Sequence, residues 1–309
     1  MKAKLIFNPA SGNPAESAAQ LLELLRQLQT VNIQAEVLVV QPEMRLSALA
    51  RHAVRNGFRM VIVSGGDGTI ENVALGLVGS ATTLGIIPTG TRNNLARSLG
   101  IPTDNPAGAV ALLREGCRLK IDVGQIRQGH VRRFFLEAGA VGLASALYPS
   151  ADDIQHGDLG KIPEFISTLV SAAPSVIRLR LDHHRREIIT HAHMVLVANM
   201  PFLGANFQVA PDVLFGDHQL DVFVYSELGK VDLIDHAVRN TIDERIQRFQ
   251  VKRIVIATDP PMPVMADGVL LGDGPATLTV LPNGLAAMAS PTGIPGAAPA
   301  PASVAEVTV

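Results

Sequence analysis

Residues 60–71 read Met-Val-Ile-Val-Ser-Gly-Gly-Asp-Gly-Thr-Ile-Glu, and this stretch decides the fold. An apolar, β-branched run stops at Ser64 and an apolar-periodic segment follows over residues 69–78, which predicts a strand, a tight glycine turn and a helix. Glycine lets a backbone approach a ligand closely, and the first turn of a helix points N–H groups toward it. The turn therefore suits phosphate, and Asp67 is placed to bind a metal ion or accept a proton.

The glycine turn is also compatible with a plain loop. Its spacing matches neither the dinucleotide fingerprint G-x-G-x-x-G nor the P-loop G-x-x-x-x-G-K-[ST]. The neighbouring segments therefore decide between a loop and a phosphate site.

Strands and helices alternate on both sides of this turn. The pattern predicts strands at residues 4–7, 35–40 and 83–87, and helices after Pro14, over residues 46–54 and after Asn94; the first helix has the apolar stripe Ala18, Leu21, Leu22, Leu25 and Leu28. Such alternation indicates a parallel sheet, where ligands gather beyond the carboxyl ends of the strands. Three polar loops, at residues 8–12, 65–69 and 90–94, follow strands at that edge. One nucleotide could touch all three.

The second half of the chain has a different pattern. Short extended runs occur at residues 176–182, 187–199, 220–225, 251–258 and 277–281, with a hairpin turn at 182–186 and helices expected only over 161–173 and 234–249. The fold class predicted is α/β, with a parallel-sheet nucleotide-binding domain over residues 1–125 and a mainly antiparallel, β-sandwich-like domain over 126–290. Residues 291–309, rich in Pro and Ala, are expected to form a disordered tail.

Composition excludes several classes of protein. With 47% hydrophobic and 17% charged residues, the 309-residue chain can build real cores and is not globally disordered. A net charge of −2 gives no electrostatic reason to expect nucleic acid. The single cysteine fits a reducing compartment, no apolar run reaches the roughly 18 residues of a transmembrane segment, and no signal peptide is evident, so a cytoplasmic location is expected.

The ordered motifs resemble the diacylglycerol/lipid kinase family, which includes soluble bacterial diacylglycerol kinases, YegS-like lipid kinases and sphingosine kinases. They are Asn-Pro-Ala-Ser-Gly at residues 8–12, Gly-Gly-Asp-Gly-Thr at 65–69, P-x-G-T-x-N-x-x-A-R at 88–97, Ile-Asp-Val-Gly at 121–124, Ala-Pro-Asp at 210–212 and Asp-Gly at 267–268. The resemblance implies an α/β domain followed by a β-rich domain. It also implies transfer of the γ-phosphate of ATP, with Mg²⁺, to a lipid hydroxyl by a protein that contacts membranes peripherally.

The loops and the resemblance together predict a set of site residues. The nucleotide contacts expected are Asn8, Ser11, Gly12, Gly65, Gly66, Asp67, Gly68, Thr69, Ile70, Glu71, Gly90, Thr91, Asn93 and Arg97, although Arg97 fits a surface position equally well. The catalytic residues expected are Asp67, Asp122 and Asp267, the first two shaping a network of metal and water. The resemblance implies a structural Mg²⁺ on Asp217 and the backbone carbonyls of Leu214 and Gln219.

The chain departs from the family at two functional positions. The family's general base is the glutamate of an Asp-Gly-Glu triplet, which here reads Asp267-Gly268-Val269, and valine cannot take a proton. Asp67, Asp267 or Asp273 could substitute, the reaction could depend on positioning and metal alone, or kinase activity could be lost. At the implied structural metal site, Gly-Asp-His at residues 216–218 replaces Asp-Asp-Gly and removes one carboxylate.

Two alternatives to a lipid kinase stay open. NAD kinase shares the Gly-Gly-Asp-Gly core, but the motifs at 88–97 and 210–222 favour the lipid family. A nucleotide-binding regulatory protein without turnover is the alternative that Val269 suggests. The sequence identifies neither the lipid nor whether the chain forms a homo-oligomer.

Overall fold

The computed structural model describes residues 1–11, 14–147, 159–161, 163–164, 167–168, 173–182, 186–203, 207–208, 212–226 and 246–291. The helices are α1 (Ser17–Thr30), α2 (Leu46–Arg55), α3 (Asp67–Leu77), α4 (Asn94–Ser98) and α5 (Pro106–Glu115), with the 3-10 turns η1 (Pro14–Glu16) and η2 (Leu159–Lys161). The strands in the first half are β1 (Lys2–Phe7), β2 (Gln34–Val39), β3 (Met60–Gly65), β4 (Thr83–Pro88), β5 (Cys117–Gln128), β6 (Val131–Phe135) and β7 (Ala138–Gly142). The remaining strands are β8 (Ser175–Leu181), β9 (Ile188–Ala192), β10 (Met194–Ala198), β11 (Phe202–Leu203), β12 (Phe207–Gln208), β13 (Leu220–Tyr225), β14 (Gln247–Val251), β15 (Arg253–Asp259), β16 (Pro263–Ala266), β17 (Val269–Asp273) and β18 (Ala276–Ala289).

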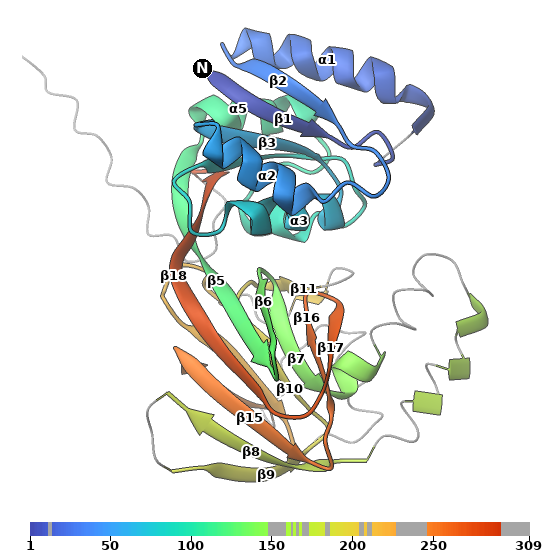
Figure 1. The fold of residues 1–309 in the computed structure, drawn as a ribbon, viewed down its shortest axis with the longest axis vertical. Helices are drawn as coiled ribbons and strands as arrows, with labels where there is room; N and C mark the ends of the chain where they lie inside the picture. The colour runs from blue at the N-terminus through green and yellow to red at the C-terminus, as the bar shows by residue number, and fades with distance from the viewer. Residues whose placement is uncertain are drawn as a thin grey trace, which may run out of the picture.

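The predicted parallel sheet is confirmed and forms four strands of a ten-stranded mixed sheet. Strands β2, β1, β3 and β4 pair in parallel in that order, and helices cover them, with α1 against α5 and α2 against α3 (Figure 1). Every residue of β3 and β4 is buried, as expected of parallel strands covered on both faces. All three polar loops therefore lie at the carboxyl edge of this part of the sheet.

Two long strands connect the helical region to the β-rich region. Strand β18 pairs in parallel with β4 near its end and antiparallel with β15 near its start, and β5 runs antiparallel to it along nearly its whole length (Figure 1). The mixed sheet continues from β15 through β8 to β9. The expected domain boundary near residue 125 falls inside β5, and it stays a prediction.

A second, antiparallel sheet packs against the part of the mixed sheet that contains β18, β15 and β8. Its order is β14-β13-β10-β7-β16-β17. Leu179, Ile254 and Leu278 from the mixed sheet share one buried cluster with Val195 and Val222 from the second sheet. These side chains form the core between two facing sheets, which confirms the α/β class with a sandwich-like second half.

The expected single strand over residues 187–199 is wrong. The chain breaks at His193, so that β9 pairs with β8 in one sheet and β10 pairs with β7 and β13 in the other. The backbone of His193 donates to the Tyr225 carbonyl and accepts from the Leu143 N–H, and these bonds satisfy its polar groups at the crossing.

Two helix predictions also need correction. In α1 the expected Leu28 is buried and Leu21 and Leu25 pack against the core, but Leu22 is 61% exposed and Leu24 is buried in its place. The helix expected over 234–249 ends in residues that form β14 instead, and the rest of it lies outside the described residues. The helix expected over 161–173 also lies mostly outside them, as does the tail after residue 291.

A substitution at Gly124 tests the packing between β5 and β6. Gly124 pairs with the fully buried Phe135, and a methyl group at residue 124 would collide with the phenyl ring. We expect Gly124→Ala to lower the free energy of unfolding by about 2 kcal/mol, as overpacked sites typically do. The control is Gly216→Ala, where no atom lies within 4 Å of an added Cβ, with an expected change within about 0.5 kcal/mol. Equal effects in urea denaturation would contradict this account of the packing.

Candidate functional site

Two of the three polar loops meet backbone to backbone. Gly66 follows β3 and Gly90 follows β4, and a Cβ on Gly90 would lie 2.5 Å from the Gly66 Cα. The Thr89 N–H donates to the Gly65 carbonyl at 3.0 Å, which holds the loops in this register. Glycine is required at residue 90 because any side chain there would separate the loops.

Asp67, in the loop after β3, holds the loop after β4 in place. Its carboxylate accepts the backbone N–H of Asn93 at 2.8 Å and of Asn94 at 2.7 Å. These are donors at the start of α4, so the aspartate caps that helix from another loop. Asn93 adopts a left-handed conformation with φ of 54°, and its side chain closes the loop by bonding the backbone N–H and carbonyl of Gly90.

The loop after β1 is joined to the other two loops by hydrogen bonds between side chains. The Asn8 amide donates to the Thr69 hydroxyl at 2.8 Å, and the Thr89 hydroxyl donates to that of Ser11 at 3.0 Å. Since the Thr69 oxygen accepts from Asn8, its own proton is directed elsewhere. The prediction that the three loops converge is therefore confirmed as geometry.

The first turn of α3 presents unused donors at this point. The N–H groups of Thr69 and Ile70 both bond the Gly66 carbonyl, whereas no hydrogen bond among the described residues uses the N–H of Asp67 or Gly68. Gly68 is exposed, and no atom lies within 4 Å of where its Cβ would be. An anion placed here would meet backbone donors and the positive end of an eleven-residue helix.

Four carboxylates surround the same place. Asp67 and Glu71 come from α3, Glu137 precedes β7, and Asp267 lies in the turn between β16 and β17. The Asn94 side chain donates to Glu137 at 3.2 Å, and the Glu137 N–H donates to Asp267 at 3.0 Å. All four residues are partly exposed, so they line a surface that solvent reaches.

Mutual repulsion and burial perturb three of these groups. Burial, then the charge of Asp267, raises the pKa of Glu71 to about 8 against the opposing effect of Arg133. Burial, then Asp267 and Asp67, raises the pKa of Glu137 well above its usual range. Burial raises the pKa of Asp267 to about 6, although its carboxylate accepts the N–H groups of residues 136–138. A cation bound beside these groups would favour their ionised forms.

Sequence reasoning did not find Glu137 or Arg133. Glu137 is a lone acidic residue in the apolar run at residues 134–144, and a charge in such a run is the signal that could have identified it. The Arg133 guanidinium lies 3.4 Å from the Glu71 carboxylate, which is a contact between residues 62 apart in the chain.

The other residues predicted to contact the nucleotide differ in their exposure and in what they touch. Thr91 is exposed beside the loops, whereas the Ile70 side chain is buried in the core and could contribute only its backbone. The Arg97 guanidinium lies over the Phe202 ring at 4.4 Å, which brings β11 close to α4. Gly12 lies outside the described residues.

Asp122 does not share the hydrogen-bond network of Asp67. Its fully buried carboxylate accepts the N–H of His218 at 2.6 Å, the His218 ring at 3.0 Å and the N–H of Asn283 at 2.8 Å. These donors come from the segment before β13 and from a bend within β18. These hydrogen bonds hold the segment before β13 against β18, and the role of Asp122 in a network of metal and water stays a prediction.

The predicted structural metal ligands lie in the segment that Asp122 holds. The Asp217 carboxylate accepts the Gln219 N–H at 3.0 Å through one oxygen, and burial raises the pKa of Asp217. Leu214 and Gln219 are partly exposed beside it. Among the described residues, no three His, Cys, Asp or Glu side chains are placed to hold a metal ion by themselves, here or around Asp67. A Mg²⁺ at Asp217 would therefore depend on carbonyl oxygens and one carboxylate, and one near Asp67 on oxygens of the nucleotide.

Of the alternative bases, Asp273 lies at the other end of the β16–β17 hairpin from Asp267. It is exposed at the open end of the β16–β17 hairpin, opposite Pro263, whereas Asp267 is in the closed turn. Val269 begins β17 next to that turn and is 40% exposed. A longer side chain at residue 269 would therefore have room to reach the carboxylates.

Comparison with known families decides the assignment. Residues 2–126 match the model of the diacylglycerol kinase catalytic domain, and residues 155–289 match that of the YegS C-terminal NAD kinase beta sandwich-like domain. The chain belongs to the diacylglycerol kinase family. It is a family of lipid kinases that use ATP.

Named relatives and solved structures agree with this family membership. A diacylglycerol kinase of Mycobacterium tuberculosis H37Rv is 28% identical over 249 residues, covering 76% of this chain and 80% of that protein. A diacylglycerol kinase of Bacillus subtilis 168 is 25% identical over 276 residues, covering 86% and 89%. The crystal structure of a diacylglycerol kinase from Bacillus anthracis Sterne has a TM-score of 0.74 at 22% identity, covering 94% and 97%, and confirms the fold.

The raised pKa of Glu71 predicts how this family member responds to pH. A carboxyl whose pKa rises from 4.5 to about 8 on folding stabilises the protein below pH 4.5 and loses that contribution as the pH rises toward 8. We expect Glu71→Gln, which stays neutral, to gain about 2 kcal/mol in unfolding free energy relative to wild type between pH 5 and pH 8.5. Glu115→Gln, at an exposed residue of α5, is the matched control. A difference between wild type and Glu71→Gln that is independent of pH would contradict the coupled carboxylates.

Proposed function

We propose that the protein is an ATP- and Mg²⁺-dependent kinase that transfers the γ-phosphoryl group to a hydroxyl of a diacylglycerol-like lipid. The observation that carries the proposal is the pair of unused N–H groups at Asp67 and Gly68, which face the convergent loops beside a cluster of carboxylates. Phosphoryl transfer is mostly positioning and charge stabilisation, and this site supplies both phosphate donors and acidic groups for a cation.

The loops would bind the triphosphate. In this proposal the N–H groups of Asp67 and Gly68 donate to phosphate oxygens, and the Thr69 hydroxyl, whose oxygen accepts from Asn8, donates its proton. Gly66 and Gly90 keep the approach clear of side chains. The backbone of these loops therefore recognises charge and shape, and leaves the base of the nucleotide to other contacts.

The carboxylates fit a magnesium ion that enters with the nucleotide. Mg²⁺ prefers oxygen ligands and retains water, and a cation beside Asp67, Glu71 and Glu137 would favour the ionised carboxylates against the burial that raises the pKa of Glu71 and Glu137. When bound, it would neutralise charge on the transferred phosphoryl group. Asp67 has its remaining lone pairs available for this because only two N–H donors engage it.

Glu137 is the carboxylate that we propose as proton acceptor from the lipid hydroxyl. Asp267 is committed to three backbone N–H groups, whereas the Asn94 amide holds Glu137 beside the loop that Asp67 anchors. Burial, then the charges of Asp267 and Asp67, raises the pKa of Glu137, which makes its ionised form a stronger base than an exposed carboxylate. This arrangement would let the chain function without a glutamate at residue 269.

A lipid substrate requires contact with a bilayer. No helix among the described residues is long and apolar enough to cross one. We therefore propose that the protein reaches its substrate from the membrane surface.

Val269 also supports a second candidate, a nucleotide-binding regulatory protein without turnover. Its side chain is apolar and 40% exposed where the family's base is expected. The same loops would then bind ATP without a phosphate acceptor, so only an assay of product separates the two functions.

The deciding experiment is thin-layer separation of products after incubation with labelled ATP, Mg²⁺ and a panel of lipids. We expect label in a lipid product for wild type, and a fall in kcat of about 100-fold or more for Glu137→Gln, the lower range for removal of a general base. Val269→Glu should change kcat much less in the wild-type background and restore turnover in the Glu137→Gln background. Glu115→Gln is the exposed control.

Two outcomes would contradict the proposal. Intact ATP binding without labelled lipid would favour the regulatory protein. Labelled lipid with an unaffected Glu137→Gln variant would preserve the kinase and exclude Glu137 as its base.

A further inference from the structure

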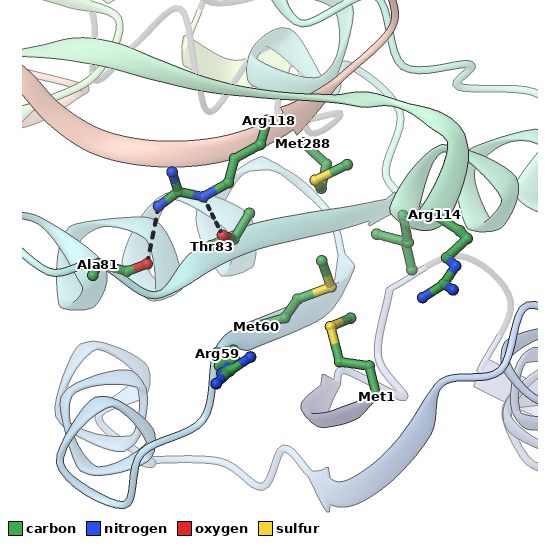
Figure 2. Close-up of a pocket in the computed structure, with 9 residues that line it drawn as sticks. Met1, Arg59, Met60, Ala81, Thr83, Arg114, Arg118 and Met288 are labelled. Atoms are coloured by element: carbon green, nitrogen blue, oxygen red, sulfur yellow. Dashed lines mark hydrogen bonds between the residues drawn. The ribbon is translucent and has the colours of Figure 1, made fainter.

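A cavity lined by residues of β3, β4, β5, β18 and α5 lies far along the strands from the phosphate loops. It has a volume of about 460 Å³, within the range of small-ligand sites. Met60 begins β3 and Thr83 begins β4, so the cavity opens at the amino ends of the parallel strands (Figure 2). The phosphate loops follow the carboxyl ends of the same strands, so the two sites are separated by the length of the sheet.

Three arginines from different elements surround this cavity. Arg59 precedes β3, Arg114 is in the last turn of α5, and Arg118 is in β5; all three are exposed (Figure 2). Arg118 is fixed in place because it donates to the Thr83 hydroxyl at 2.8 Å and the Ala81 carbonyl at 3.1 Å. The other two guanidinium groups make no ion pair or hydrogen bond with any described residue.

No negative charge offsets these cations within the cavity. The described residues that line it include no aspartate or glutamate. An adjoining hollow of about 370 Å³ shares Arg59 and adds Lys2. The net charge of the whole chain is −2, so this concentration of positive charge is local.

The floor of the cavity is apolar. Leu113, Met60 and Met288 line it and are themselves nearly buried, at 3%, 5% and 7% exposure. In Figure 2 the two thioether side chains lie between the arginines. Methionine side chains adapt to irregular apolar ligands, and guanidinium groups match phosphate oxygens.

We propose that this cavity binds the headgroup of an anionic phospholipid, with the phosphate on Arg59, Arg114 and Arg118 and the glycerol and first methylenes on the methionine floor. A ligand with a charged phosphate next to an apolar chain meets both halves of the cavity. A free phosphate would leave the floor unused. The site is distinct from the proposed ATP site and does not depend on kinase activity.

The binding would attach the protein to an anionic bilayer at a second place. Basic groups near a bilayer contribute about 1 kcal/mol each, and salt weakens their effect. The attachment should therefore be selective for anionic lipid and weaken as salt increases.

The first test is sedimentation with vesicles in the absence of ATP, using phosphatidylcholine alone or mixed with phosphatidylglycerol. We expect binding only to the mixed vesicles, and a loss of affinity of about tenfold or more in the double variant Arg59→Ala/Arg114→Ala. Arg118 is left intact because it bonds Thr83. The control is Arg26→Ala/Arg45→Ala, which removes the same charge from exposed positions outside the cavity. Equal losses of vesicle affinity in both double variants would contradict a phospholipid site in this cavity.

The second test places the ligand in the cavity. In protein with ¹³C-labelled methionine methyl groups, we expect dihexanoyl phosphatidylglycerol to shift the signals of Met60 and Met288, each assigned by its Leu variant. Dihexanoyl phosphatidylcholine and glycerol 3-phosphate should leave them in place. Unshifted signals with the anionic lipid would refute the proposal, and equal shifts with glycerol 3-phosphate would assign the cavity to free phosphate compounds instead. Neither readout requires turnover, so a failed kinase assay would neither support nor refute this proposal.

Discussion

The Asp67 carboxylate is the interaction on which the site depends. By accepting the N–H groups of Asn93 and Asn94, it fixes the start of α4 against the start of α3. The contact is possible only because Gly66 and Gly90 let the two loops touch through their backbones. A carboxylate used this way leaves the N–H groups of its own helix turn pointing outward. The loop architecture and the donors proposed for phosphate thus arise from one side chain.

The β-rich half completes the site from the other side. Strands β5 and β18 extend out of the parallel sheet into the second half, so their pairing determines where the connection between β6 and β7 lies. Asp267 then holds that connection by accepting the N–H groups of residues 136–138, which places Glu137 beside Asn94. Groups from both halves therefore meet at the carboxyl edge of the parallel strands, with the repulsion that raises the pKa of Glu71 and Glu137.

The sequence predicted what depends on local pattern and little of what depends on distant partners. Buried strands, the glycine turn and the shared edge of three loops follow from periodicity and chain order, so they were predictable. The Asn94–Glu137 hydrogen bond joins residues 43 apart, and Asp267 reaches residues about 130 away, so neither has a local signal. The hydrogen bonds that the Asp122 carboxylate accepts from His218 and Asn283 had no local signal for the same reason, since both partners lie far along the chain. The roles of the site residues stay predictions.

The most direct measurement of the central claim is a crystal structure with Mg²⁺ and a non-hydrolysable ATP analogue. The account predicts phosphate oxygens within hydrogen-bond distance, about 3 Å, of the N–H groups of Asp67 and Gly68, with the terminal phosphate facing Glu137. Phosphates bound elsewhere, with those N–H groups still facing solvent, would contradict it.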